Sequence, residues 1–244
     1  MTTAERSNAI VSSLFPTQVR ERLMGDEKNN GGRKNTKQRA FLGAHDLHMP
    51  FSTAKSNNTD VENGHKSKIY SPDVESKPIA DHFPFATVMF ADIAGLTAWS
   101  SVREPSQVFT LLEQIYSSFD AIAKRRRVFK VETIGDCYVA VAGLPVARDD
   151  HAVVMARFAN DCEVKMMNVV RKLEVLLGPG TAELGMRFGL HSGPVMAGVL
   201  RGDKSRFQLF GDTVNTASRI EATGDRNMIH VSQETARLLV EAGK

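Results

Sequence analysis

Between residues 81 and 244, some stretches show the apolar pattern of strands and others the helical spacing of apolar residues. A β-rich run over 85–92 predicts a strand, and apolar residues at helical spacing over 106–123 predict a helix. Two apolar runs, 128–134 and 137–142, flank Gly135-Asp136, a pair that favours a hairpin turn. The remaining predicted elements are a long helix over 149–177, strands over 186–191 and 195–200 joined at Ser192-Gly193-Pro194, a helix over 213–222, a strand over 228–231 and a helix over 232–241.

The order of these elements is β-α-β-β-α-β with additions. This order is typical of an α+β fold in which a ferredoxin-like sheet carries its helices on one face. We therefore expect a single folded domain over 81–244, which is long enough to bury a sizeable core.

The first 80 residues follow neither pattern for long. Over residues 1–24, apolar residues at helical spacing are interrupted at Pro16, which predicts a kinked amphipathic helix that pairs with a partner surface. Residues 25–80 hold too few apolar side chains to offset the entropy of ordering the chain. We expect this stretch to be a disordered linker.

Composition narrows the class of protein. The 244 residues carry a net charge of +3, all of it in residues 1–80, so the folded domain is neutral and gives no reason to expect nucleic-acid binding. No apolar run reaches the roughly 18 residues that a membrane helix needs, so we expect no membrane segment in this chain. Two cysteines without metal-ligand spacing fit a reducing compartment, and we expect a cytoplasmic domain, with any membrane anchor in a parent protein.

Candidate chemistry begins in FADIAGLTAWS, where Asp92 ends an apolar strand and Gly95 opens a helix. Backbone N–H groups at Gly95, Leu96 and Thr97 can hold a phosphate, while Asp92 can hold a metal ion. Taken alone, an Asp after a strand is usually a helix cap rather than a metal ligand. In the expected topology this strand lies next to the hairpin, so Asp136 can approach Asp92 and share a hard cation such as Mg²⁺.

A second candidate group lies in the helix predicted over 213–222. Asn215 and Arg219 stand four residues apart, so one helix face presents an amide and a guanidinium side by side. This arrangement suits contacts to a ribose or phosphate and stabilises charge on a transferring phosphoryl group. An ordinary surface pair is the alternative interpretation.

Together these segments resemble the catalytic domain of class III nucleotidyl cyclases, and guanylyl cyclases more than adenylyl cyclases. FADIAGLT, KVETIGDCYVAVAGLP, GLHSGPVMAGVL and LFGDTVNTASRIEATG occur in the family's order over roughly residues 82–241. The earlier segment SSLFPTQVRERL resembles the helix that often precedes such domains and pairs two of them.

The resemblance implies a reaction and a role for each candidate residue. Asp92 and Asp136, with the backbone carbonyl of Ile93, would bind two Mg²⁺ or Mn²⁺ ions per site. The 3′-hydroxyl of GTP would attack its α-phosphorus in line and release pyrophosphate, giving cyclic GMP for intracellular signalling. Asn215 and Arg219 would reach this site from a partner subunit, so we expect a homodimer, or a heterodimer with another cyclase domain.

Base choice rests, by the same resemblance, on Glu132 and Gln208. Glu132 can accept hydrogen bonds from guanine N1–H and N2–H₂, whereas adenine N1 is itself an acceptor. Guanylyl cyclases typically carry Cys where this chain has Gln208. A Gln amide can donate to guanine O6 or turn round and accept from adenine N6–H₂. The pair therefore favours GTP but leaves ATP, and an adenylyl cyclase, as an alternative.

Two departures from the family pattern support a further alternative. The basic residue that holds the triphosphate is assigned to Lys204, in the loop RGDKSRF, with Arg201 and Arg206 near it. The family usually continues beyond the position of Lys244 with a strand pair and a phosphate-binding lysine. On that comparison we expect the domain to be truncated and its activity reduced, and an inactive dimerisation or regulatory module is the alternative.

Overall fold

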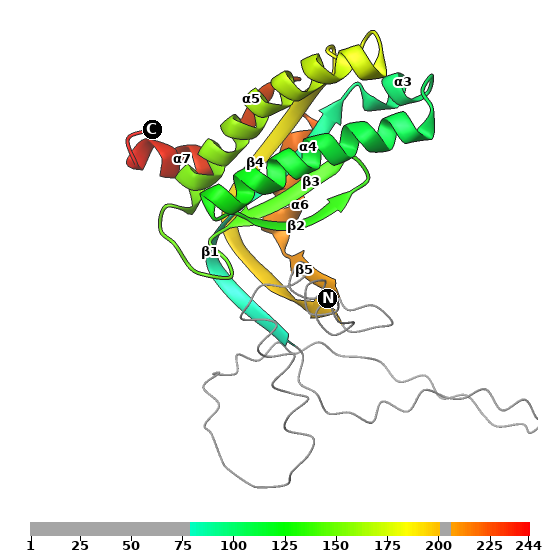
Figure 1. Ribbon diagram of the computed structural model, residues 1–244. Helices are drawn as coiled ribbons and strands as arrows, with labels where there is room; N and C mark the ends of the chain where they lie inside the picture. The colour runs from blue at the N-terminus through cyan, green and yellow to red at the C-terminus, as the bar shows by residue number, and fades with distance from the viewer. Residues whose placement is uncertain (1–78, 201–205) are drawn as a thin grey trace, which may run out of the picture. The chain divides into compact units, whose positions relative to one another are not determined.

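The computed structural model describes residues 79–200 and 206–244, which form a six-stranded sheet with helices packed on it (Figure 1). The strands are β1 (Ile79–Ala94), β2 (Phe129–Ile134), β3 (Cys137–Ala142), β4 (Gly185–Leu200), β5 (Arg206–Phe210) and β6 (Met228–Val231). The helices are α3 (Leu96–Ser100), α4 (Pro105–Arg126), α5 (His151–Leu177), α6 (Asp212–Ala222) and α7 (Gln233–Glu241).

The strand order confirms the predicted ferredoxin-like topology. The sheet runs β2-β3-β1-β4-β5, and β6 pairs in parallel with β4. The chain order β1-α4-β2-β3-α5-β4 gives the expected βαββαβ unit, in which β1 lies between β3 and β4 and is antiparallel to both. The α+β class is therefore correct.

Helices α4 and α5 lie side by side on one face of the sheet (Figure 1) and enclose the main core. Alternate residues of the strands point into it, as the pleat of a strand requires. Phe188 and Leu190 of β4, Tyr138 of β3 and Phe158 of α5 are all fully buried there. This packing explains why the apolar periods of 3.6 and 2 could be read from the sequence.

The prediction that all helices cover one face is wrong for α6, which packs on the opposite face. Gly189 points away from the core, and a Cβ atom there would lie 2.2 Å from the Glu221 amide nitrogen and 2.6 Å from the Ala217 carbonyl oxygen. A glycine at this position therefore lets the backbone of α6 approach the sheet directly.

The strands predicted over 186–191 and 195–200 are one continuous strand, β4, which pairs with β1 along its whole length. Pro194 does not interrupt β4, because the register between β1 and β4 shifts opposite this residue, between Phe83 and Ala86 of β1. Pro84 lies inside the same shift. A proline has no N–H for a ladder bond, so two prolines at one irregularity cost the sheet little.

Strand β1 also begins earlier than predicted. Ile79 and Ala80 were assigned to the linker, yet they pair with Val199 and Gly198 of β4. The predicted helix over 1–24, the rest of the 25–80 linker and Lys204 lie outside the described residues. Among the helices that the structure describes, none has the length and apolar character needed to cross a membrane.

A series of hydrogen bonds between buried polar side chains connects four elements on the sheet face that α5 covers. Thr87 Oγ1 of β1 lies 2.7 Å from His151 Nδ1 of α5 and 2.8 Å from Ser192 Oγ of β4. Ser192 Oγ lies 2.8 Å from Thr235 Oγ1 of α7. All four side chains are buried, and each makes at least one hydrogen bond within this series of contacts.

Candidate active site

Asp92 lies near the end of β1, where strands on both sides fix its position. Its register partners are Cys137 of β3 and Arg187 of β4. Because successive side chains of a strand point to opposite faces, Asp92 faces away from the core that holds Ala91 and Ile93. The carboxylate therefore lies on the face that α6 occupies, with 17% of its side chain exposed.

Asp136 reaches Asp92 through the tight turn between β2 and β3. The turn consists of Gly135 and Asp136, and Gly135 adopts φ +63°, a conformation that a two-residue hairpin loop commonly requires of a glycine. The next residue, Cys137, is the one that pairs with Asp92. The predicted approach of the two carboxylates is thus produced by local turn geometry and strand register.

Burial raises the pKa of Asp92, and the negative charge of Asp136 raises it further. Glu221 adds to this effect, while the Arg187 guanidinium opposes it. Two carboxylates that crowd each other in this way favour a cation between them. Tyr116 of α4 lies in the same electrostatic neighbourhood, and its buried hydroxyl has no hydrogen-bond partner among the described residues.

The donor set fits a divalent ion such as Mg²⁺ or Mn²⁺. Such ions prefer oxygen ligands and are commonly held by one or two carboxylates, with waters and substrate phosphates completing the shell. Ile93, whose carbonyl was predicted as a ligand, lies one residue beyond the last pair that β1 forms with β3. Within the part of the chain that is described, no group of three or more His, Cys, Asp or Glu side chains forms a closed metal site.

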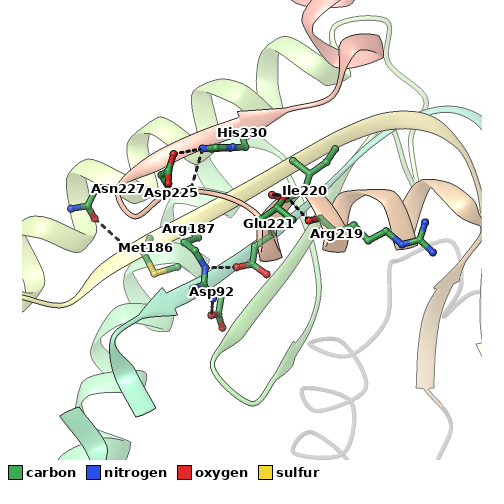
Figure 2. A network of polar contacts seen from close by, with 10 residues as sticks. Asp92, Met186, Arg187, Arg219, Ile220, Glu221, Asp225, Asn227 and His230 are labelled. Atoms are coloured by element: carbon green, nitrogen blue, oxygen red, sulfur yellow. Dashed lines mark hydrogen bonds and ion pairs between the residues drawn. The ribbon is translucent and has the colours of Figure 1, made fainter. Parts of the chain in front are cut away.

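Two residues of this region, Arg187 and Glu221, were not predicted from the sequence. Arg187 donates from Nη2 to Asp92 Oδ2 at 2.5 Å and from Nε to Glu221 Oε1 at 2.9 Å, as Figure 2 shows. Arg187 could have been found from the alternation in GMRFGLH. In this segment Arg187 and Gly189 lie on one face of the strand, and the apolar residues lie on the other face. A small residue on that face indicates that another element covers it.

The phosphate-binding segment predicted after Asp92 is the start of α3. Gly95 is the residue before this five-residue helix and adopts φ +92°. Gly95 and Thr97 are exposed, whereas the Leu96 side chain is buried in the core. Gly95 and Thr97 are thus exposed near the end of β1, and their carbonyl oxygens accept hydrogen bonds from the backbone N–H groups of Trp99 and Ser101.

Asn215 and Arg219 are exposed on one face of α6, as their spacing predicts. The opposite face of α6 carries Thr213, Ala217 and Glu221, which are buried against β4. In Figure 2 the Arg219 side chain points away from Asp92 and Arg187. The structure therefore does not bring Asn215 and Arg219 to the two aspartates of the same chain.

Glu132 follows an irregularity in β2. The register with β3 shifts between Lys130 and Glu132, which leaves Val131 as the extra residue. Such a bulge re-aims the side chains that follow it. Glu132 then pairs with Val139, which in turn pairs with Phe90, so all three belong to the sheet face that carries Asp92.

Gln208 lies on β5, opposite Gly198 of β4, and is half-buried. The neighbouring Phe207 packs edge-on against Phe129 of β2, with 5.2 Å between the ring centroids. Thus β2 and β5, at opposite ends of the strand order, approach each other around the sheet. The two residues predicted to read the base therefore lie on strands that touch.

By the roles that the family resemblance implies, the residues predicted from the sequence divide into two groups. Asp92, Ile93 and Asp136 form the first group, with the start of α3 beside them. The second group is Glu132, Gln208, Asn215 and Arg219, carried by β2, β5 and α6. We call these the metal half-site and the nucleotide half-site.

Residues 80–243 match the profile of the Adenylate and Guanylate cyclase catalytic domain. The chain belongs to this family. A curated relative of this cyclase domain, the receptor-type guanylate cyclase gcy-28 of Caenorhabditis elegans, is 44% identical over 165 residues. These residues are 67% of the present chain but 12% of the relative, so the chain spans about an eighth of that protein's length.

Solved structures of other cyclase domains share the fold. The guanylate cyclase domain of RhGC from Catenaria anguillulae, in complex with GTP, is 38% identical with a TM-score of 0.57, covering 65% of this chain and 84% of that one. The guanylyl cyclase domain of the RhoGC fusion protein from Blastocladiella emersonii, solved as a non-canonical dimer, is 38% identical with a TM-score of 0.58, covering 66% of this chain and 86% of that one. The resemblance inferred from the sequence motifs is confirmed.

Proposed function

We propose that this cyclase domain converts GTP to 3′,5′-cyclic GMP and pyrophosphate. The observation that carries the proposal is the pair of carboxylates, Asp92 and Asp136, held together by strand register on the face that also carries Glu132. The relatives add support, because gcy-28 is a guanylate cyclase and the RhGC domain was solved in complex with GTP.

Asp92 and Asp136 would hold two divalent ions, with the Ile93 carbonyl as a further ligand. Bound in this way, such ions lower the pKa of the ribose 3′-hydroxyl and neutralise phosphate charge. The backbone N–H groups at Gly95 and Thr97 would contact the triphosphate. Asn215 would orient the ribose, and the Arg219 guanidinium would donate to the oxygens of the pentacoordinate phosphorus, an effect worth several kcal/mol, roughly 3–4.

The active unit in this proposal is a dimer. Arg219 points away from the metal half-site of its own chain, so a second subunit must supply the nucleotide half-site (Figure 2). A two-fold axis then produces two equivalent sites, each built from both subunits.

Glu132 supports guanine over adenine. A carboxylate accepts the two donors on the Watson–Crick edge of guanine, N1–H and N2–H₂, but faces the N1 lone pair of adenine. The half-buried position of Glu132 strengthens this selection, because an unmatched polar contact costs more when water is excluded. Gln208 permits either base, and for this reason cyclic AMP synthesis is the second candidate.

The first test incubates the full chain with GTP or ATP and Mg²⁺ or Mn²⁺ and measures both cyclic nucleotides. Cyclic GMP should form in preference to cyclic AMP, and Asp92→Ala should abolish the product. Glu132→Lys should shift the preference toward ATP, while Glu163→Lys, a charge reversal on α5, should leave it unchanged. Preference of the unmodified chain for ATP would establish the second candidate, and no product from either nucleotide at dimer-forming concentrations would indicate a non-catalytic module.

A second test examines the shared sites by mixing two inactive variants. Asp92→Ala removes the metal half-site and Arg219→Ala removes the nucleotide half-site. With random exchange, half of the dimers are mixed and each has one intact site, so about a quarter of the unmodified activity should return. No recovery, in a mixture where exchange is verified, would mean that each subunit builds its own site.

A further inference from the structure

Arg187 forms ion pairs with two carboxylates that belong to different parts of the molecule. Asp92 lies in the metal half-site, on β1, and Glu221 lies near the C-terminal end of α6 (Figure 2). The side chain of Glu221 is only 9% exposed and that of Asp92 17%. Because both carboxylates are largely withdrawn from water, their contacts with the guanidinium are stronger than those of an exposed ion pair.

The two carboxylate partners of Arg187 differ in their surroundings. The hydrogen bond to Glu221 contributes most to raising the pKa of Arg187, ahead of the smaller contribution from Asp92. Asp92 in turn has a second neighbour, Asp136, and is predicted to bind cations. A cation can therefore compete with the Arg187 guanidinium for Asp92, whereas no cation-binding role is predicted for Glu221.

Helix α6 contacts β4 at several points along its length, and Glu221 is its contact nearest the C-terminal end. Thr213 Oγ1 donates to the Pro194 carbonyl at 2.7 Å near its first turn. Gly189 lets the middle of the helix lie directly on the strand. Asn215 and Arg219 stand on the far side of this same helix.

We propose that Arg187 is a positioning residue that couples the metal half-site to the nucleotide half-site of the same chain. The inference rests on the proposed cyclase function. A divalent cation at Asp92 competes with the guanidinium for this carboxylate, and Arg187 then remains with Glu221 alone. The C-terminal turn of α6 then loses its ion-pair path through Arg187 to Asp92 on β1, which changes the freedom of Asn215 and Arg219.

In a dimer this link crosses from one active site to the other. The metal half-site of one chain and its nucleotide half-site serve different sites, so cation binding in one site alters the residues that the same chain contributes to the second. The coupling has a defined route of two ion pairs, and both ends of it can be altered separately. It is a coupling free energy between sites, with Arg187 as the shared element.

The first measurement is Mn²⁺ affinity of the full chain without nucleotide, by electron paramagnetic resonance or calorimetry. Arg187→Met removes the competitor and should tighten Mn²⁺ binding roughly three- to tenfold. Glu221→Gln releases Arg187 to Asp92 and should weaken it by a similar factor. Arg237→Met is the matched control, because its ion pair with Glu241 on α7 is exposed and should not affect Mn²⁺.

The signs separate coupling from a purely structural role. If Arg187 only stabilised the fold, both variants would weaken Mn²⁺ binding together, and this result would overturn the proposal. Arg187→Lys serves if Arg187→Met does not fold, because one ammonium group cannot bridge both carboxylates in the same way. It should also tighten Mn²⁺ binding, by a smaller factor.

The second measurement is hydrogen exchange of the α6 amides with and without Mn²⁺. Exchange over 219–222 should become faster when Mn²⁺ binds the unmodified chain and should not respond in Arg187→Met. An unchanged or slower exchange, with Mn²⁺ bound, would overturn the proposal. Neither readout needs turnover, so a chain that binds Mn²⁺ and responds in α6 but makes no cyclic nucleotide would reject the proposed function and keep the coupling.

Discussion

At the scale of single residues, the buried imidazole of His151 links stability to pH. The ring is 4% exposed and lies against Thr87, and burial lowers its pKa below the ordinary value of 6.5, although Asp150 and Asp149 partly oppose this. The native state therefore holds the ring neutral where the unfolded chain would protonate it. The stabilising contribution of the neutral ring is complete above about pH 6.5 and is lost as the pH falls below it.

The corresponding prediction compares the unmodified chain with His151→Gln in urea unfolding at pH 7.5, 6.5 and 5.5. Below pH 6.5 the unmodified chain should lose up to about 1.4 kcal/mol of unfolding free energy per pH unit more than the variant. His230→Gln, which removes an imidazole outside this series of buried hydrogen bonds, is the control. Parallel curves for His151→Gln and the unmodified chain would contradict the assignment.

The sequence made Asp92 and Asp136 visible because both depend on local signals, a strand end and a two-residue turn. Arg187 and Glu221 were missed for the opposite reason. Their contact spans 34 residues and requires α6 to lie on the second face of the sheet. No local preference encodes which face a short helix will cover, and the only indication was the placement of Gly189 beside Arg187 in the strand alternation.

At the scale of elements, β4 shows where turn signals mislead. Ser192-Gly193-Pro194 resembles a connection, and only the matching irregularity at Pro84 on β1 allows one strand to continue through it. That compensation comes from a partner more than one hundred residues away in sequence, whose register cannot be read locally. The hairpin at Gly135-Asp136 was predictable because both of its strands and its turn are contiguous.

Gly189→Ala tests the docking of α6 on β4. The added Cβ would meet backbone atoms of Glu221 and Ala217, which cannot rotate away, so the helix must shift and the unfolding free energy should fall by about 3 kcal/mol. Gly135→Ala has no atom within 4 Å of its new Cβ and should cost only the left-handed backbone, roughly 1–2 kcal/mol. Equal losses in denaturant unfolding would show that Gly189 is not a docking point.

At the scale of the whole molecule, exposed apolar side chains gather where β4 and β5 pair. Met196 and Phe210 are register partners and are 53% and 43% exposed, and Leu200 on the same strand is 53% exposed. Apolar side chains that lie together on a surface indicate a contact face for another protein surface. Since β5 carries Gln208 of the nucleotide half-site, we propose that this face contacts the second subunit of the proposed dimer.

Phe210→Asp should therefore weaken the dimer about tenfold or more and lower specific activity most at low protein concentration. Analytical ultracentrifugation measures the association, and circular dichroism checks that the fold is kept. Val175→Asp is the control, because Val175 is 94% exposed on α5 and is as accessible to a charge. A dimer that survives Phe210→Asp unchanged would place the interface elsewhere.

The unbroken strand β4 also constrains how this gene can change. Its 16 residues extend about 50 Å and hold Arg187 near one end and Gly198, beside Gln208, near the other. Inserting one codon between them would turn every following side chain to the wrong face. Inserting two would restore the faces but displace Gln208 by about 7 Å. Any functional descendant should keep the interval from Arg187 to Gly198 at constant length, while surface loops are free to grow.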